Sequence, residues 1–131
     1  MTVVADASVV VAALVDTGPV GQRAERLVAA EDLAAPHLMP VEVANVLRRA
    51  VLAGDVSEEV GALAHADLTD LRVQLFPYEV VAERVWELHR TVTAYDAWYV
   101  ALAESLDTAL ATLDVALSLA NGPRCPFSIP E

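Results

Sequence analysis

The chain opens with Thr2-Val3-Val4-Ala5-Asp6-Ala7-Ser8-Val9-Val10, a β-branched run that ends at a carboxylate and leads into a second apolar run. Residues 2–5 predict a buried strand, because Thr and Val favour the extended conformation. Residues 8–15 predict a helix that Gly18-Pro19 ends. A strand followed directly by a helix is the building unit of α/β domains with a mostly parallel sheet.

The rest of the chain repeats this alternation of short apolar runs with longer segments of helical period. We expect further strands at 33–38, 72–76, 108–112 and 126–129, and helices at 20–30, 40–53, from 57 onward, 79–92, 94–106 and 115–120. The sequence therefore predicts an α/β fold with a central, mostly parallel sheet of four to five strands flanked by about seven helices. We expect residues 1–131 to form one domain.

Composition excludes several classes of protein. The net charge of -11, with eight arginines and no lysine, argues against sequence-independent binding to duplex nucleic acid. The absence of lysine also removes a phosphate-loop GK motif and a Schiff-base nucleophile. No membrane span and no secretory signal are predicted, so we expect a cytoplasmic protein. The 56% hydrophobic content exceeds what one small core requires and predicts an apolar surface for a partner or a dimer.

Four acids, Asp6, Glu42, Asp96 and Asp114, lie inside or against apolar runs. A buried, ionised carboxylate must find hydrogen bonds, a cation or a raised pKa. Taken singly, Asp6 and Asp114 can be explained as helix caps, and Glu42 as a first-turn acid that favours the helix dipole. Asp96 is harder to explain in this way, because its helix, residues 94–103, is apolar nearly all round and is typical of a buried helix.

Taken together, the four acids fall at strand ends and helix starts that share one edge of a parallel sheet, where ligands bind in such folds. Two carboxylates ~4 Å apart repel by about 4 kcal/mol at an effective dielectric of about 20. Such a cluster either takes up protons or holds a cation. Ligands that are all oxygen favour Mg²⁺ or Mn²⁺, and sites of this kind hydrolyse phosphodiesters with metal-activated water.

Other catalytic chemistries find no matching pattern. His37, His65 and His89 are far apart and show no zinc-site spacing, so each is interpreted as a surface or hydrogen-bonded histidine. The single Cys125 is interpreted as a packed or incidental thiol. The chain also lacks a Gly-rich nucleotide loop and a G-x-S-x-G elbow.

Four segments, in this order, resemble the motif regions of PIN-domain ribonucleases, and their spacing and the chain length resemble the VapC toxins of bacterial toxin-antitoxin pairs. The segments are Asp6-Ala7-Ser8-Val9-Val10, Pro40-Val41-Glu42-Val43-Ala44-Asn45-Val46-Leu47-Arg48-Arg49, Tyr95-Asp96-Ala97-Trp98-Tyr99-Val100-Ala101-Leu102-Ala103 and Thr112-Leu113-Asp114. The resemblance covers nearly the whole chain. It implies a PIN-like fold and Mg²⁺- or Mn²⁺-dependent endoribonuclease activity.

The resemblance also implies roles for individual residues. The metal ligands and catalytic acids would be Asp6, Glu42, Asp96 and Asp114, with Thr112, Asn45 and Ser8 in support. The nearest basic candidates for RNA contact are Arg48 and Arg49 on the segment after Pro40. The resemblance further implies a homodimer and a cognate VapB-like antitoxin. After Asp114 the chain departs from the family, continuing as Val115-Ala116-Leu117 where further polar residues are common.

Two alternatives stay open at this point. A PIN-like binding module with weak catalysis would fit the net charge of -11 and the apolar segment after Asp114. A small metal-dependent phosphatase or DNA nuclease would use the same acids and differ only in substrate.

Overall fold

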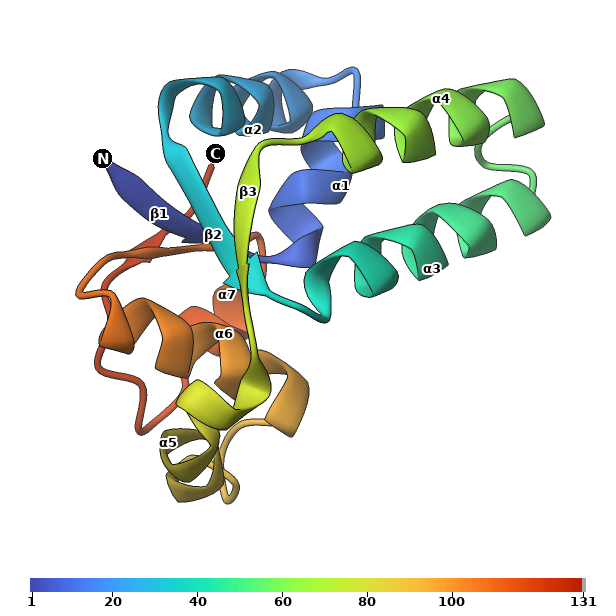
Figure 1. Ribbon diagram of the computed structural model, residues 1–131. Coiled ribbons are helices and arrows are strands. Elements are labelled where there is room, and N and C mark those ends of the chain that lie inside the picture. Colours follow the sequence, from blue (N-terminus) through green and yellow to red (C-terminus); the bar gives the residue numbers. More distant parts are fainter. Residues whose placement is uncertain (131) are drawn as a thin grey trace.

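A parallel sheet of five strands forms the centre of the computed structural model, which describes residues 1–130 (Figure 1). The strand order is β3-β2-β1-β4-β5, and all four neighbouring pairs are parallel. The strands are β1 Thr2–Ala5, β2 Asp32–Pro36, β3 Val73–Phe76, β4 Leu110–Ala111 and β5 Phe127–Ser128. The α/β class and the parallel sheet predicted from the sequence are confirmed.

Seven α-helices connect and cover these strands within residues 1–130, and Figure 1 shows α2 and α6 on opposite sides of the sheet. The helices are α1 Ala7–Val15, α2 Pro19–Ala30, α3 Met39–Leu52, α4 Glu58–Asp70, α5 Ala82–Glu87, α6 Ala94–Ser105 and α7 Val115–Ser118. A short 3₁₀ helix, η1, spans Tyr78–Val80. The predicted number of helices is confirmed.

Local chemistry explains where the main helices begin. The side chains of Asp6, Ser57, Thr93 and Asp114 cap α1, α4, α6 and α7 by accepting a backbone N–H of the first turn. Helices α2 and α3 instead carry a proline in the first turn, where its missing N–H costs nothing. The caps at Asp6 and Asp114 follow β1 and β4, so they also fix the direction in which the chain leaves the sheet edge.

Helix α6 runs through the core. From Tyr99 to Ala103 every residue is buried, as is Ala97, so the buried helix predicted for residues 94–106 is confirmed. It packs against β1, β2 and β4. A helix covered on nearly all sides holds any polar group in its first turn in a fixed place relative to the sheet.

The helix predicted for residues 79–92 is wrong in extent. The segment is divided into η1, the six residues of α5 and turns that continue to Val92. Its apolar residues Val81, Val85, Leu88 and Val92 are all buried, which explains the helical spacing in the sequence. After α5 the backbone closes i to i+3 hydrogen bonds, as from Thr91 N to Leu88 O, so the helix does not continue although the side chains stay buried.

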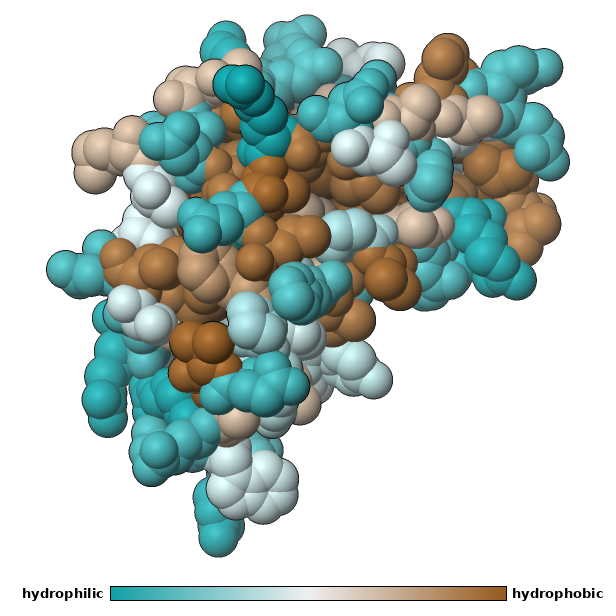
Figure 2. All heavy atoms as spheres, viewed as in Figure 1, coloured by the Kyte–Doolittle hydropathy of each residue, from teal (hydrophilic) through white to brown (hydrophobic). Residues whose placement is uncertain are grey.

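Within residues 1–130, no helix is long and apolar enough to cross a membrane. Apolar side chains nevertheless reach the surface, and Figure 2 shows them gathered over the region of β3 and beside the α3–α4 pair. The exposed ones on that pair include Val41, Leu52, Val60 and Leu63. Part of the excess of apolar residues noted in the sequence therefore lies on the surface and not in the core.

Candidate active site

Asp6 lies directly after β1 and is buried, with 7% of its surface exposed. Its Oδ1 accepts hydrogen bonds from the Ser8 hydroxyl at 2.5 Å and from the Val9 amide at 3.2 Å. Its Oδ2 accepts one from the Thr112 hydroxyl. Burial raises the pKa of Asp6, and these hydrogen bonds oppose the rise. Asp6 is thus both the cap of α1, as the simpler interpretation predicted, and an anchored buried acid.

Asp114 reaches the same edge from β4. Ala5 of β1 is paired with Ala111 of β4, so Asp6 and Thr112 both stand one residue beyond the paired ends. The Thr112 hydroxyl accepts the backbone N–H of Asp114 at 3.0 Å, and the Asp114 carboxylate caps α7. Asp114 is exposed, so its position against an apolar run did not signal burial.

Glu42 enters from the first turn of α3 and is half-buried. Its Oε1 accepts a hydrogen bond at 2.6 Å from the hydroxyl of Tyr99 on α6. Burial raises the pKa of Glu42, the Tyr99 hydrogen bond lowers it, and the negative charges of Asp96 and Asp6 raise it further. Burial and the Glu42 carboxylate also raise the pKa of Tyr99, which keeps its hydroxyl protonated as the donor.

Asp96 stands in the first turn of α6, whose N-cap is Thr93. Burial raises the pKa of Asp96, and so do the nearby charges of Asp114 and Asp6. The effect of these two charges on the pKa of Asp96 shows that it lies near the acids that follow β1 and β4. The edge shared by these elements therefore gathers all four predicted acids, together with the hydroxyls of Ser8 and Thr112.

The cluster contains no protein cation. Among residues 1–130, none of the four acids forms an ion pair with an arginine, a histidine or the N-terminus. In the same part of the chain, no three Asp, Glu, His or Cys side chains already stand in positions that could hold a metal ion together. The four carboxylates are thus neighbours that repel one another, and their donor chemistry, oxygen alone, suits Mg²⁺ or Mn²⁺.

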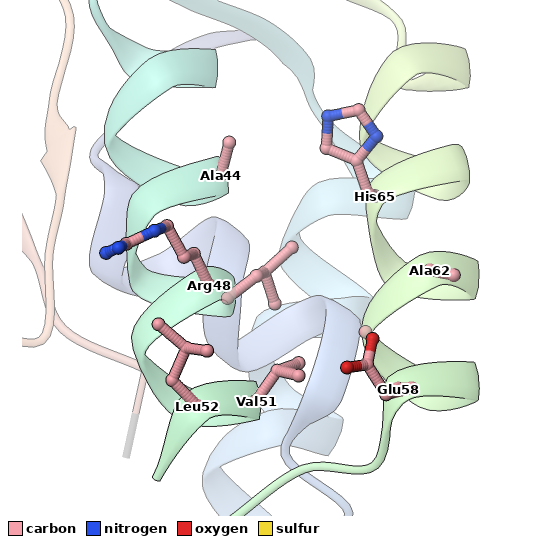
Figure 3. A pocket seen from close by; sticks show the side chains of 9 residues that line it. Ala44, Arg48, Val51, Leu52, Glu58, Ala62 and His65 are labelled. Atoms are coloured by element: carbon pink, nitrogen blue, oxygen red, sulfur yellow. The ribbon is translucent and has the colours of Figure 1, made fainter.

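The predicted supporting residue Asn45 and the predicted RNA-binding residues Arg48 and Arg49 lie further along α3 than Glu42. Asn45 and Arg49 follow Glu42 by one and two helical turns on its own face, and both are exposed. Arg48 lies at the edge of a groove of about 340 Å³ between α3 and α4, where Figure 3 shows its side chain pointing away from α4. A role in RNA binding for Arg48 and Arg49 stays a prediction.

Tyr99 was missed as a site residue in the sequence. The available signal was its spacing, because a residue three positions after Asp96 lies on the same helix face. An aromatic residue in an apolar helix is ordinarily core, and the apolar pattern of residues 94–103 indicates burial of the helix without a role for Tyr99. Only the contact with Glu42, 57 residues away in sequence, reveals the second function of its hydroxyl.

The PIN-domain model matches residues 3–122 of this chain. The chain belongs to the PIN-domain family. Over 127 residues it is 39% identical to VapC ribonuclease Mb0985 of Mycobacterium bovis, with 97% of each chain covered. Ribonuclease VapC1 of Mycobacterium tuberculosis is also 39% identical, with 96% of each chain covered. The full-length similarity places this PIN domain among the VapC ribonucleases.

Solved structures share the fold of this PIN domain at low sequence identity. VapBC2 from Rickettsia felis, bound to a DNA fragment from its promoter, matches with a TM-score of 0.67 and 12% identity over 100% of both chains. The toxin VapC20 of Mycobacterium tuberculosis, described as cleaving the sarcin-ricin loop, matches with a TM-score of 0.62 and 17% identity over 82% of this chain and 86% of that chain. The PIN-like fold predicted from the sequence is confirmed.

Proposed function

We propose that this PIN domain is a Mg²⁺- or Mn²⁺-dependent endoribonuclease acting as the toxin of a toxin-antitoxin pair. The observation that supports this proposal most strongly is the cluster of Asp6, Glu42, Asp96 and Asp114. Three of these acids have raised pKa values, and none of the four is paired with a protein cation. The VapC ribonucleases that resemble it over 96–97% of its length support RNA as the substrate.

The cation would be held by the four carboxylates. The four carboxylates repel one another, and a divalent cation would remove that repulsion. A cation held there would supply an activated water and would neutralise the charge that develops on the scissile phosphate. Such a bound cation would also bring RNA phosphate to a protein whose own net charge is -11.

The chain's own residues prepare this edge for the reaction. Ser8 and Thr112 hold the Asp6 carboxylate from two sides, so its orientation is set before any ligand arrives. The same two hydroxyls accept the backbone N–H groups of Leu113 and Asp114, which fixes the start of α7. Arg49, two turns after Glu42 on the same face of α3, is the candidate contact for the RNA backbone.

A VapB-like antitoxin is the proposed partner. A groove of about 410 Å³, bounded by α3, α4 and β3, is lined mainly by apolar side chains, among them Val41, Leu68 and Leu75. An apolar groove on an acidic protein suits an amphipathic segment with basic flanking residues. We also propose a homodimer, supported by Leu52, Val60 and Leu63, which are exposed on the α3–α4 pair.

Isothermal titration with Mn²⁺ and an RNA cleavage assay test the enzymatic proposal. The wild-type protein should bind Mn²⁺ and cleave RNA only when a divalent cation is present. Asp96→Asn should lose cleavage while keeping the circular dichroism spectrum of the wild type. Full activity of Asp96→Asn would overturn the assignment, and absence of Mn²⁺ binding at millimolar concentration would favour a PIN-like binding module.

A further inference from the structure

The Tyr99 side chain joins the protein core to the acid cluster. It is 2% exposed, and its ring is enclosed by the packing of α6. Its hydroxyl nevertheless ends at Oε1 of Glu42, at 2.6 Å. Because Glu42 belongs to α3, this hydrogen bond connects the two helices that carry Glu42 and Asp96.

Apart from the Tyr99 hydrogen bond, little restrains the side chain of Glu42. Its side chain has three rotatable torsions and is only half-buried. Within residues 1–130, the hydrogen bond from Tyr99 is the only one to its carboxylate. A packed tyrosine ring has far less freedom, so its hydroxyl provides a fixed point for one carboxylate oxygen.

The position of Tyr99 on α6 also suits the cluster. Asp96 and Tyr99 are three residues apart on one helix, so both project from the same face. The helix that supplies one acid therefore supplies the hydrogen bond that orients another. Ser8 and Thr112 act on Asp6 in the same manner, from a different pair of elements.

We propose that Tyr99 is a positioning residue for the metal site, holding Oε1 of Glu42 and leaving Oε2 for the cation. The proposal rests on the proposed function. Groups that hydrogen-bond a metal-binding carboxylate from behind typically affect metal affinity 10- to 100-fold, roughly, when removed. A tyrosine that only filled the core would affect stability and leave the metal affinity unchanged.

Tyr99→Phe tests the proposal, because it removes the hydroxyl and keeps the ring. We expect its Mn²⁺ dissociation constant, measured by isothermal titration, to rise roughly tenfold or more. Tyr95→Phe is the matched control. Tyr95 is on the same helix, next to Asp96, but is 63% exposed, so this substitution should leave the affinity within about twofold of the wild type. Thermal unfolding of the metal-free variants verifies that both fold.

A double-mutant cycle locates the effect. In the Glu42→Ala background, Tyr99→Phe should cause no further loss of Mn²⁺ affinity, because the carboxylate that it orients is gone. Equal tenfold losses in both backgrounds would overturn the proposal, as would a Tyr99→Phe protein that binds Mn²⁺ as tightly as the wild type. Failure of the wild type itself to bind Mn²⁺ would instead overturn the metal site, so the two failures are distinguishable.

A measurement on the wild type covers the case in which Tyr99→Phe does not fold. The buried hydroxyl proton of Tyr99 should exchange slowly with water and give a resonance identified by its nuclear Overhauser effects to the ring. Titration with diamagnetic Mg²⁺ should shift this resonance, because the cation withdraws electron density from Glu42. A resonance that does not move at saturating Mg²⁺ would contradict the proposal.

Discussion

Helix α6 carries an acid at each end, and the two acids have opposite surroundings. Asp96 in its first turn faces other carboxylates, which raise its pKa together with burial. Glu104 in its last turn accepts Arg84 Nε at 2.7 Å and Nη2 at 3.2 Å, and also the backbone N–H of Arg124 at 2.7 Å. Burial alone would raise the pKa of Glu104, but these partners lower it overall.

The surroundings of Asp96 and Glu104 differ because an arginine, one of eight in the chain, pairs with Glu104 and none pairs with Asp96 in residues 1–130. Arg84 serves a structural cluster, since it also donates to Gly122 O and to Glu87, and so ties α5 and α6 to the segment before β5. Within residues 1–130, no arginine forms an ion pair with the acids at the edge of β1 and β4. An acid cluster left without a protein cation is a place for a cation from solution, whereas a paired acid is part of the scaffold.

The same substitution in both regions should give the largest contrast in activity. Glu42→Gln should reduce RNA cleavage by at least ~100-fold, because it removes one of the carboxylates proposed to hold the cation. Glu104→Gln should leave cleavage within about threefold of the wild type. Initial rates with one RNA and saturating Mn²⁺ provide the measurement. Equal losses in the two variants would mean that the two clusters are not separate in function.

The contrast should reverse for stability. Glu104→Gln should lower the free energy of unfolding by about 2 kcal/mol, because Arg84 loses a bidentate ionic partner that is only 15% exposed. Glu42→Gln should leave the stability of the metal-free protein unchanged or raise it, since it relieves repulsion from Asp96 and Asp6. Urea denaturation of metal-free protein measures both, and a strongly destabilised Glu42→Gln protein would contradict the expectation.

The pH dependence of stability should also have opposite signs. The pKa of Asp6, Glu42 and Asp96 is raised on folding, so the folded state binds more protons than the unfolded state. Their contribution is fully present below the ordinary values of 3.8 and 4.5 and is lost as pH rises through the raised values. The lowered pKa of Glu104 acts the other way, with stability present above 4.5 and lost as pH falls through the lowered value.

Metal-free Glu42→Gln protein should therefore lose less stability than the wild type as pH rises from about 4 to 7. Glu104→Gln should lack the stability that the wild type has above pH 4.5 from this group and loses as pH falls through the lowered pKa. Thermal unfolding from about pH 3 to 7 in the absence of divalent cations measures both slopes. Identical slopes in all three proteins would show that neither cluster is linked to proton binding.

The smallest effect is expected when the ion pair is replaced as a whole. Arg84→Met combined with Glu104→Met should destabilise by only about 1 kcal/mol, less than Glu104→Gln alone, because no buried charge is left unpaired. The Arg124 amide and the Gly122 carbonyl lie on exposed residues and can bond water instead. A double variant less stable than the single one would mean that the arginine contributes through its other contacts.

Sequence patterns predicted most of the fold because its elements are locally encoded. The alternation of β-branched runs with capped helices located all five strands, and Asp6 and Asp114 were recognised both as caps and as acids of the sheet edge. The segment 79–92 was predicted wrongly, because the spacing of Val81, Val85, Leu88 and Val92 reports burial rather than a continuous helix. Periodicity records which side chains face the core and not how the backbone bonds between them.

By itself, the sequence determined that Asp6 and Asp114 would meet at one sheet edge, since each follows a strand and the ends of parallel strands lie together. It also determined that no lysine could neutralise them. Only the tertiary structure decided that Arg84 pairs with Glu104, that Asp114 is exposed, and that the Tyr99 hydroxyl reaches Glu42. Such pairings join residues far apart in the chain, so their geometry depends on how whole helices pack and leaves no local pattern.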